Sequence, residues 1–168
     1  MDEARLERHD SCDLSILGQS IADATELPGM RDLMLQSGQE ALDAAIGVGT
    51  AIVPIFGLTE DDVTRPGTVV ETLLDRLLEG FVLPHSMSTV LQDWAKSRRS
   101  EVDEINGHVV RTGHQLGWQT PVNTAVVDLA HAIERGDLHP SPANLELLLD
   151  AATAKRRTNG APRYARGR

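Results

Sequence analysis

The sequence has few of the features that usually reveal the class of a protein. Its 168 residues contain one cysteine, Cys12, which excludes an intramolecular disulfide framework and a cysteine-rich zinc site. Aromatic residues make up 3%, so the core must be aliphatic. No apolar run approaches the ~18 residues that a membrane span needs. Residues 1–8 are charged and lack the apolar region of a secretory signal, so we expect a cytosolic protein.

Charge is abundant but unevenly placed along the chain. The net charge is −9, yet the segment 155–168 holds six basic residues and no acidic one. Residues 1–154 therefore carry a net charge of −15, which repels phosphate backbones and argues against nucleic acid as a partner. The basic tail is interpreted as a solvated, disordered end, with contact to an anionic partner as the weaker alternative.

Apolar residues recur at helical spacing along almost the whole chain. The pattern predicts an all-α domain of about seven helices. A helix start is expected near Pro28, and helix ends are expected at Gly80, Gly117 and Gly136. The expected helices lie near 14–24, 30–46, 70–79, 88–95, 100–116, 121–135 and 142–152.

One region departs from the helical pattern. The segment 47–66 is short and β-branched, and because a lone strand would have no ladder partner, we expect an extended connector. A polar start signal at Thr59 then predicts a short helix. Three parts follow: a charged N-terminal segment (1–12), a helical domain (13–154) and a basic tail (155–168).

Most catalytic and cofactor motifs are missing. The only GxG, Gly47-Val48-Gly49, is expected to follow a helix rather than a strand, so Gly47 is interpreted as a left-handed cap and not as part of a dinucleotide site. The six histidines form no HExxH pair, and we expect no metal site. Cys12 has no defined base nearby, which leaves nucleophilic catalysis without support.

The most informative stretch runs from Ser86 to Asn123. It holds a set of polar residues among apolar core positions: Thr89, Gln92, Asp93, Glu101, Asp103 and Asn106. One interpretation is a site in which helix starts aim hydroxyl and carboxylate groups at a small ligand. The other is scaffold, with Ser88 and Ser100 as N-caps and Asp93 and Glu101 as first-turn acids. The pattern alone favours scaffold.

The spacing of these residues resembles the ketopantoate reductase family. The run from Ser88 to Asp93, with Glu101 eight residues later, is similar to that family's S-S-M-L-Q-D … G-R-x-T-E-I-D-x-x-N-G signature. Asn106-Gly107 completes the signature, and the segment 116–123 (LGWQTPVN) matches a later G-x-x-[TV]-P-x-N segment. The resemblance covers about residues 14–150 and concerns only the family's C-terminal, substrate-binding helical domain.

The resemblance implies an NADPH-dependent reduction of 2-dehydropantoate to pantoate, a step of pantothenate biosynthesis toward coenzyme A. In this family a serine holds the substrate carboxylate, and that position is Thr89 here, which keeps a hydroxyl group. The signature glutamate, which contacts the hydroxyl side of the substrate, falls on Glu101. Gln92, Asp93 and Asn106 also match and are interpreted as structural.

Two departures from the family accompany these matches. The family's Rossmann domain, with its GxGxxG, has no counterpart in the 168 residues. The resemblance implies that Glu3–Asp10 corresponds to the family's K-x-x-x-N helix, and this stretch has neither lysine nor asparagine. Arg5 or Arg8 would not replace the lysine as a general acid, because a guanidinium stays protonated. We therefore expect no NADPH binding and no turnover by this chain alone.

Two hypotheses remain open. In the first, the chain is the substrate-side half of a reductase for a 2-oxo acid, either as a truncated gene product or completed by a Rossmann-domain partner chain. In the second, it is a non-catalytic helical module for dimerisation or small-acid binding. The face that a Rossmann domain would cover predicts self-association, most simply as a homodimer.

Overall fold

The computed structural model describes residues 12–81 and 87–154, and every element within these ranges is helical. The all-α prediction is therefore confirmed. In chain order the helices are α1 (Cys12–Ser15), α2 (Ile21–Thr25), α3 (Met30–Gly47), α4 (Glu60–Val63), α5 (Pro66–Phe81), α6 (Thr89–Ala95), α7 (Asn106–Gln115), α8 (Pro121–Glu134) and α9 (Asn144–Ala154). No helix in the described residues is long and apolar enough to cross a membrane.

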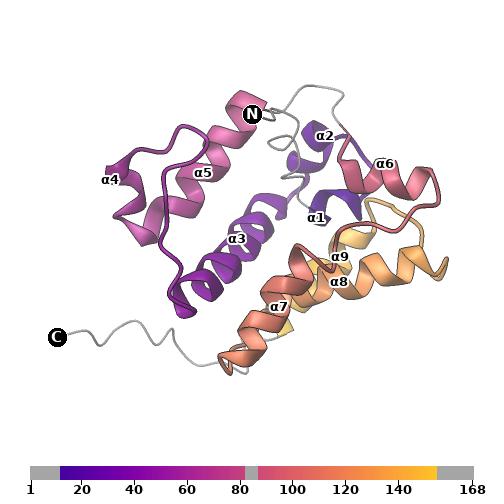
Figure 1. Cartoon of the computed structure of the whole chain (residues 1–168). Helices are drawn as coiled ribbons and strands as arrows, with labels where there is room; N and C mark the ends of the chain where they lie inside the picture. Colours follow the sequence, from indigo (N-terminus) through magenta and orange to yellow (C-terminus); the bar gives the residue numbers. More distant parts are fainter. Residues whose placement is uncertain (1–11, 82–86, 155–168) are drawn as a thin grey trace.

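Helix α3 is the central element of the fold. It contacts α7, α8 and α9 on one side and α5 on the other, so it divides the molecule into two parts (Figure 1). The larger part contains the main core, whose fully buried members include Leu17, Met30, Val122 and Leu148. Its side chains are aliphatic, as the composition requires.

The smaller part is the hairpin of α4 and α5. Leu58, Val63 and Val69 form a separate buried cluster there. Thr59 begins α4 as predicted: its hydroxyl accepts from the Asp62 amide while the Asp62 carboxylate accepts from the Thr59 amide, a complete capping box. The connector before it contains no strand in the described part of the chain, as predicted.

Four boundaries differ from the sequence-based expectation. The helix expected over 70–79 is longer, because α5 runs from Pro66 to Phe81 and continues through Gly80, which was expected to end it. The helix expected over 14–24 is interrupted, because Gly18 takes a φ of +67° and its backbone lies against Pro140. The helix expected from Ser100 begins only at Asn106. Gly47 is the last residue of α3 rather than a left-handed cap, and the positive φ belongs to Gly49, at +83°.

The role of Gly47 is steric rather than conformational. A Cβ placed there would lie 2.6 Å from both Leu116 Cδ1 and Trp118 Cη2. The glycine is therefore needed because the chain after α7 packs directly on the end of α3. A pattern of spacing along one helix cannot reveal such a contact.

The two terminal segments of the predicted domain scheme lie largely outside the described residues. These are 1–11 and 155–168, so the boundaries 1–12, 13–154 and 155–168 remain predictions. The stretch Glu3–Asp10, expected to correspond to the family's lysine helix, also lies outside them.

Candidate functional site

The first signature residue, Ser88, fixes the start of α6. Its hydroxyl accepts a hydrogen bond from the Leu91 amide at 3.1 Å, which confirms the predicted N-cap. The same hydroxyl shares a 2.5 Å hydrogen bond with Ser15 Oγ of α1. Ser88 is buried, and the next residue, Thr89, is exposed as the first residue of α6. Thr89 therefore sits beside a cap that is fixed to a second helix.

Glu101 lies in a turn that is anchored on both sides. Ser100, just before it, is buried and donates to Glu134 Oε1 of α8 from its amide (2.8 Å) and its hydroxyl (2.6 Å). Val102, just after it, is 1% exposed. Glu101 itself is exposed. A buried residue on either side of it limits the positions that its backbone can take.

Asp103 supplies a further anchor for the same turn. Its carboxylate accepts from His131 Nε2 of α8 at 2.9 Å and pairs with Arg99. The turn is thus attached to α8 at two of its residues, Ser100 and Asp103. Neither Ser100 nor Glu101 plays the role that the scaffold interpretation gave it, since Ser100 caps no helix and Glu101 precedes α7 rather than lying in a first turn.

Glu134 is the carboxylate that holds this turn. Partial burial acts to raise the pKa of Glu134, but hydrogen bonds from Ser100 and from Trp94 Nε1 (3.3 Å) outweigh it, and the pKa lies below its usual value. Arg99 Nε lies 3.9 Å from the other carboxylate oxygen. Glu134 is therefore ionised near neutral pH and joins α6, the turn and α8.

A second polar cluster is buried between α3, α7 and α8. Asn123 Nδ2 donates to Glu40 Oε2 (2.8 Å) and to the Ser37 carbonyl (3.1 Å), while its Oδ1 accepts from Asn106 Nδ2 (2.9 Å). Asn106 and Asn123 are 5% and 2% exposed. The structure thus gives Asn106 a packing role, in line with its structural interpretation.

Glu40 caps α8 from a neighbouring helix. Thr120 makes no side-chain cap, and Pro121 has no N–H, so the amides of Val122 and Asn123 need an acceptor. Both donate to the Glu40 carboxylate at 3.0 Å. Burial raises the pKa of Glu40, and these hydrogen bonds only partly oppose the shift.

Sequence reasoning missed the role of Glu40, although a signal was present. The buried residues of α3 are Met30, Leu33, Ser37 and Ala44. Glu40 continues the same three- and four-residue spacing, so it lies on the inward stripe. A carboxylate on such a stripe requires buried donors, and the amides at the start of α8 supply them.

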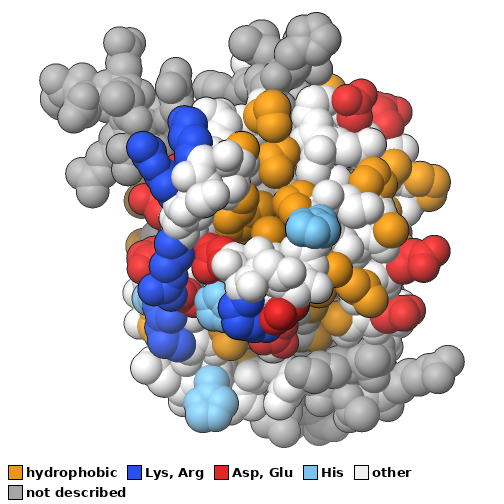
Figure 2. Space-filling view, turned by 90° about the vertical axis from the view of Figure 1, so that its right-hand side faces the viewer, with side chains coloured by type: hydrophobic (Ala, Val, Ile, Leu, Met, Phe, Trp, Pro, Cys, Tyr) orange, Lys and Arg blue, Asp and Glu red, His pale blue; other side chains and the backbone are white. Residues whose placement is uncertain are grey.

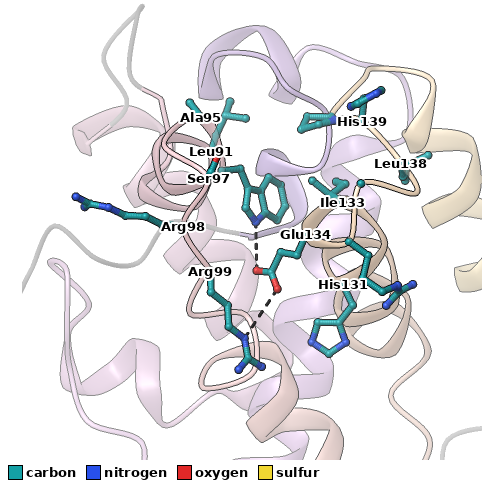
Figure 3. A pocket seen from close by; sticks show the side chains of 14 residues that line it. Leu91, Ala95, Ser97, Arg98, Arg99, His131, Ile133, Glu134, Leu138 and His139 are labelled. Atoms are coloured by element: carbon teal, nitrogen blue, oxygen red, sulfur yellow. Dashed lines mark hydrogen bonds and ion pairs between the residues drawn. The ribbon is translucent and has the colours of Figure 1, made fainter.

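A hollow lies between the end of α6, the following turn and the end of α8 (Figure 3). We call it the Trp94 hollow, and its volume is about 840 Å³. Its lining consists of Leu91, Trp94, Ala95, Ser97, Arg98, Arg99, His131, Ile133, Glu134, Arg135, Gly136, Leu138, His139 and Pro140. Neither Thr89 nor Glu101 belongs to this lining, so their convergence on one cleft stays a prediction.

The remaining signature residues have local roles. Gln92 Nε2 donates to the Met87 carbonyl at 3.0 Å, and the Asp93 carbonyl accepts from Lys96 and Arg98 amides near the end of α6. Asp93 therefore lies in the last turn of α6, not in its first. Among the described residues no group of three histidine, cysteine or acidic side chains could hold a metal ion.

Comparison with known proteins agrees with the signature. The family model described as "Ketopantoate reductase PanE/ApbA C terminal" matches residues 14–134. The chain belongs to this family. The matched span includes Ser88–Asn123 and begins after Glu3–Asp10, so that stretch is not part of the family's domain as matched here.

Two curated relatives carry the name 2-dehydropantoate 2-reductase. The protein from Pyrobaculum aerophilum is 33% identical over 107 residues, which are 64% of this chain and 33% of the relative. The protein from Archaeoglobus fulgidus is 37% identical over 49 residues, 29% of this chain and 17% of that relative. The matches thus span a third or less of each relative's length. No solved structure matches significantly.

Proposed function

We propose that this domain forms the substrate side of a ketopantoate-reductase-like oxidoreductase acting on 2-dehydropantoate or a related 2-oxo acid. The observation that carries the proposal is the anchored turn, in which Glu101 is exposed between buried Ser100 and Val102. A carboxylate on a backbone fixed in this way would accept a hydrogen bond from a substrate hydroxyl. The Thr89 hydroxyl would bind the substrate carboxylate.

The cofactor of the reaction would lie outside the described residues. A dinucleotide site needs a strand, a glycine-rich turn and a helix N-terminus. Gly47-Val48-Gly49 instead follows α3, and the described ranges hold no strand. NADPH, when bound, would supply a hydride to the ketone carbon, and we assign its binding to a Rossmann domain outside these 168 residues, in a longer form of the protein or in a partner chain. The domain alone would bind the acid without reducing it.

The proposal is tested by titrating the 168-residue chain with pantoate in a calorimeter. We expect saturable binding that Glu101→Gln and Thr89→Val each weaken about tenfold, the loss of one charged or well-placed hydrogen bond. Glu104→Gln is the matched control, because Glu104 is exposed three residues further on and should leave binding unchanged. Absence of binding, or equal losses in Glu101→Gln and Glu104→Gln, would contradict the proposal.

Self-association is a second candidate property and would suit a non-catalytic helical module as well. Val48 and Trp118, at the end of α3, and Val53 and Ile55, in the connector that follows it, are each more than a third exposed. Single exposed apolar residues are ordinary, but two at the end of one helix and two more in the segment that follows it would suit an interface. Light scattering should show a mass that rises with concentration and falls in Val53→Asp. A monomer at all concentrations would contradict it.

A further inference from the structure

His131 and Glu134 hold the turn that carries Glu101 on one face of α8. They are three residues apart, which places both side chains on the same side of the helix (Figure 3). Ser100 donates to Glu134, and three residues further along the turn Asp103 is bound by His131. The end of α8 points toward the face shown in Figure 2, where acidic, basic and histidine side chains lie close together beside an apolar area. Glu101 lies between the two points of attachment.

Asp103 lies inside the backbone turn that closes on Glu101. The Glu101 carbonyl accepts from the amides of Glu104 and Ile105, both at 3.1 Å. These two hydrogen bonds enclose Asp103, so a displacement of Asp103 also moves the Glu101 peptide and the side chain that leaves it. The bond between His131 Nε2 and Asp103 Oδ1, at 2.9 Å, therefore acts on Glu101 through one short turn.

Arg99 also pairs with Asp103 but does not replace His131 as an anchor. Arg99 lies four residues before Asp103, so this ion pair joins two parts of the same segment and leaves the position of that segment on α8 open. Arg99 Nε is 3.9 Å from Glu134, and the Arg99 side chain is 73% exposed, which makes the second pair weak. The bond from His131, by contrast, joins Asp103 to a different helix.

The exposure of this pair favours a local role over a contribution to the whole fold. The His131 and Asp103 side chains are 34% and 25% exposed, so water reaches both. Hydrogen bonds that water can replace contribute little to global stability. A binding group that is held in place before its ligand arrives loses less freedom when the ligand binds.

We propose that His131 is a positioning residue for acid binding. By holding Asp103, it fixes the turn that presents Glu101 to the substrate. His131 acts through Glu101 rather than by touching the acid. This inference rests on the proposed function, because it assigns His131 to the same site.

Hydrogen exchange in the ligand-free 168-residue chain tests whether His131 holds the turn. The amides of Ile105 and Gly107 donate to carbonyls within the turn, and their exchange should quicken about tenfold in His131→Leu, which lacks the donor. His131→Gln keeps a donor and should stay within about twofold of the parent. Exchange at Val126, in the middle of α8, should not change. His114→Leu, at an exposed histidine near the end of α7, is the matched control and should match the parent.

Calorimetry with pantoate tests whether the held turn matters for binding. His131→Leu should weaken pantoate binding about tenfold, and His131→Gln should restore it to within about twofold of the parent. In a Glu101→Ala background, His131→Leu should weaken binding no further, because the side chain that it positions is absent. A merely structural role would give the same loss with and without Glu101.

The results separate this inference from the proposed function. If the parent chain binds pantoate and His131→Leu binds it equally tightly, or loses the same factor in both backgrounds, the positioning role is refuted and the substrate-side role stands. Failure of His131→Gln to restore binding, or unchanged exchange at Ile105 and Gly107 in His131→Leu, refutes the positioning role as well. If the parent chain binds no pantoate, the proposed function fails, and the positioning role fails with it.

Discussion

Two glutamates hold opposite ends of α8, and their surroundings differ in one decisive respect. Glu40 accepts from the first amides of the helix and Glu134 lies near its last turn; both side chains are half-buried, but the loss of water weighs more heavily on Glu40. Each receives several hydrogen bonds. The pKa of Glu40 is nevertheless raised and that of Glu134 lowered.

The comparison shows that hydrogen bonds alone do not set the charge state of a carboxylate. At Glu40 the loss of water outweighs the donors, and at Glu134 the donors outweigh a smaller loss of water. Glu40 therefore serves mainly to join α3 to α8, whereas Glu134 holds the exposed turn that carries Glu101. One supports the core, and the other supports the proposed site.

Removing Glu40 should have the largest effect on stability. Glu40→Ala leaves the Val122 and Asn123 amides and the Asn123 side chain without their shared acceptor. Buried donors left in this way cost about 3 kcal/mol of unfolding free energy. Urea denaturation measures the loss. Glu79→Ala, at an exposed position of α5, is the control and should stay within about 0.5 kcal/mol of the parent. A similar loss in both variants would refute the role of Glu40.

Removing Glu134 should destabilise less and act locally. Glu134→Ala deprives Ser100 and Trp94 of their acceptor, but water can reach part of this site, so we expect a loss of about 1–2 kcal/mol. Hydrogen exchange at the Ser100 amide should quicken more than exchange in the middle of α8. Uniform acceleration through the whole chain would show that Glu134 does not specifically hold the turn.

The two glutamates should also give opposite pH dependences. Because the folded-state pKa of Glu40 is raised, its neutral form favours folding, and stability falls as the pH rises above about 4.5 through that pKa. Because the pKa of Glu134 is lowered, its contribution is present above about 4.5 and is lost as the pH falls through the lower value.

Two variants separate these two pH dependences. Glu40→Gln should reduce the loss of stability as the pH rises above about 4.5. Glu134→Gln should reduce the loss of stability as the pH falls below about 4.5. Thermal melting across pH 3–7 records both. The assignment would be contradicted if Glu40→Gln changed the pH dependence of stability below about 4.5, or if Glu134→Gln changed it above about 4.5.

Much of the fold was predictable because its signals are local. The spacing of apolar residues gave the helical class, and Thr59 and Ser88 were recognised as caps from the residues that follow them. The predicted start of α7 was wrong, because Ser100, a typical cap residue, donates a hydrogen bond to Glu134 on the distant helix α8 instead of capping α7. Gly47 was misread for the same reason, since its constraint comes from Trp118.

In the candidate site, too, the residues with local signals were predicted and those with distant partners were not. Thr89 and Glu101 were selected by motif spacing, and the structure adds the anchors that surround them. Glu40 and Glu134 are separated from their partners by 82 and 34 residues, so no pattern within one helix identifies these pairs. Whether Thr89 and Glu101 bind one molecule depends on side-chain directions that motif spacing does not determine.

The most direct test of the substrate-side role is an amide chemical-shift map of the full chain titrated with pantoate. The account predicts the largest shifts at Thr89, Glu101 and their immediate neighbours, with a single affinity for both segments. Shifts confined to other segments, or different affinities at residues 89 and 101, would contradict it.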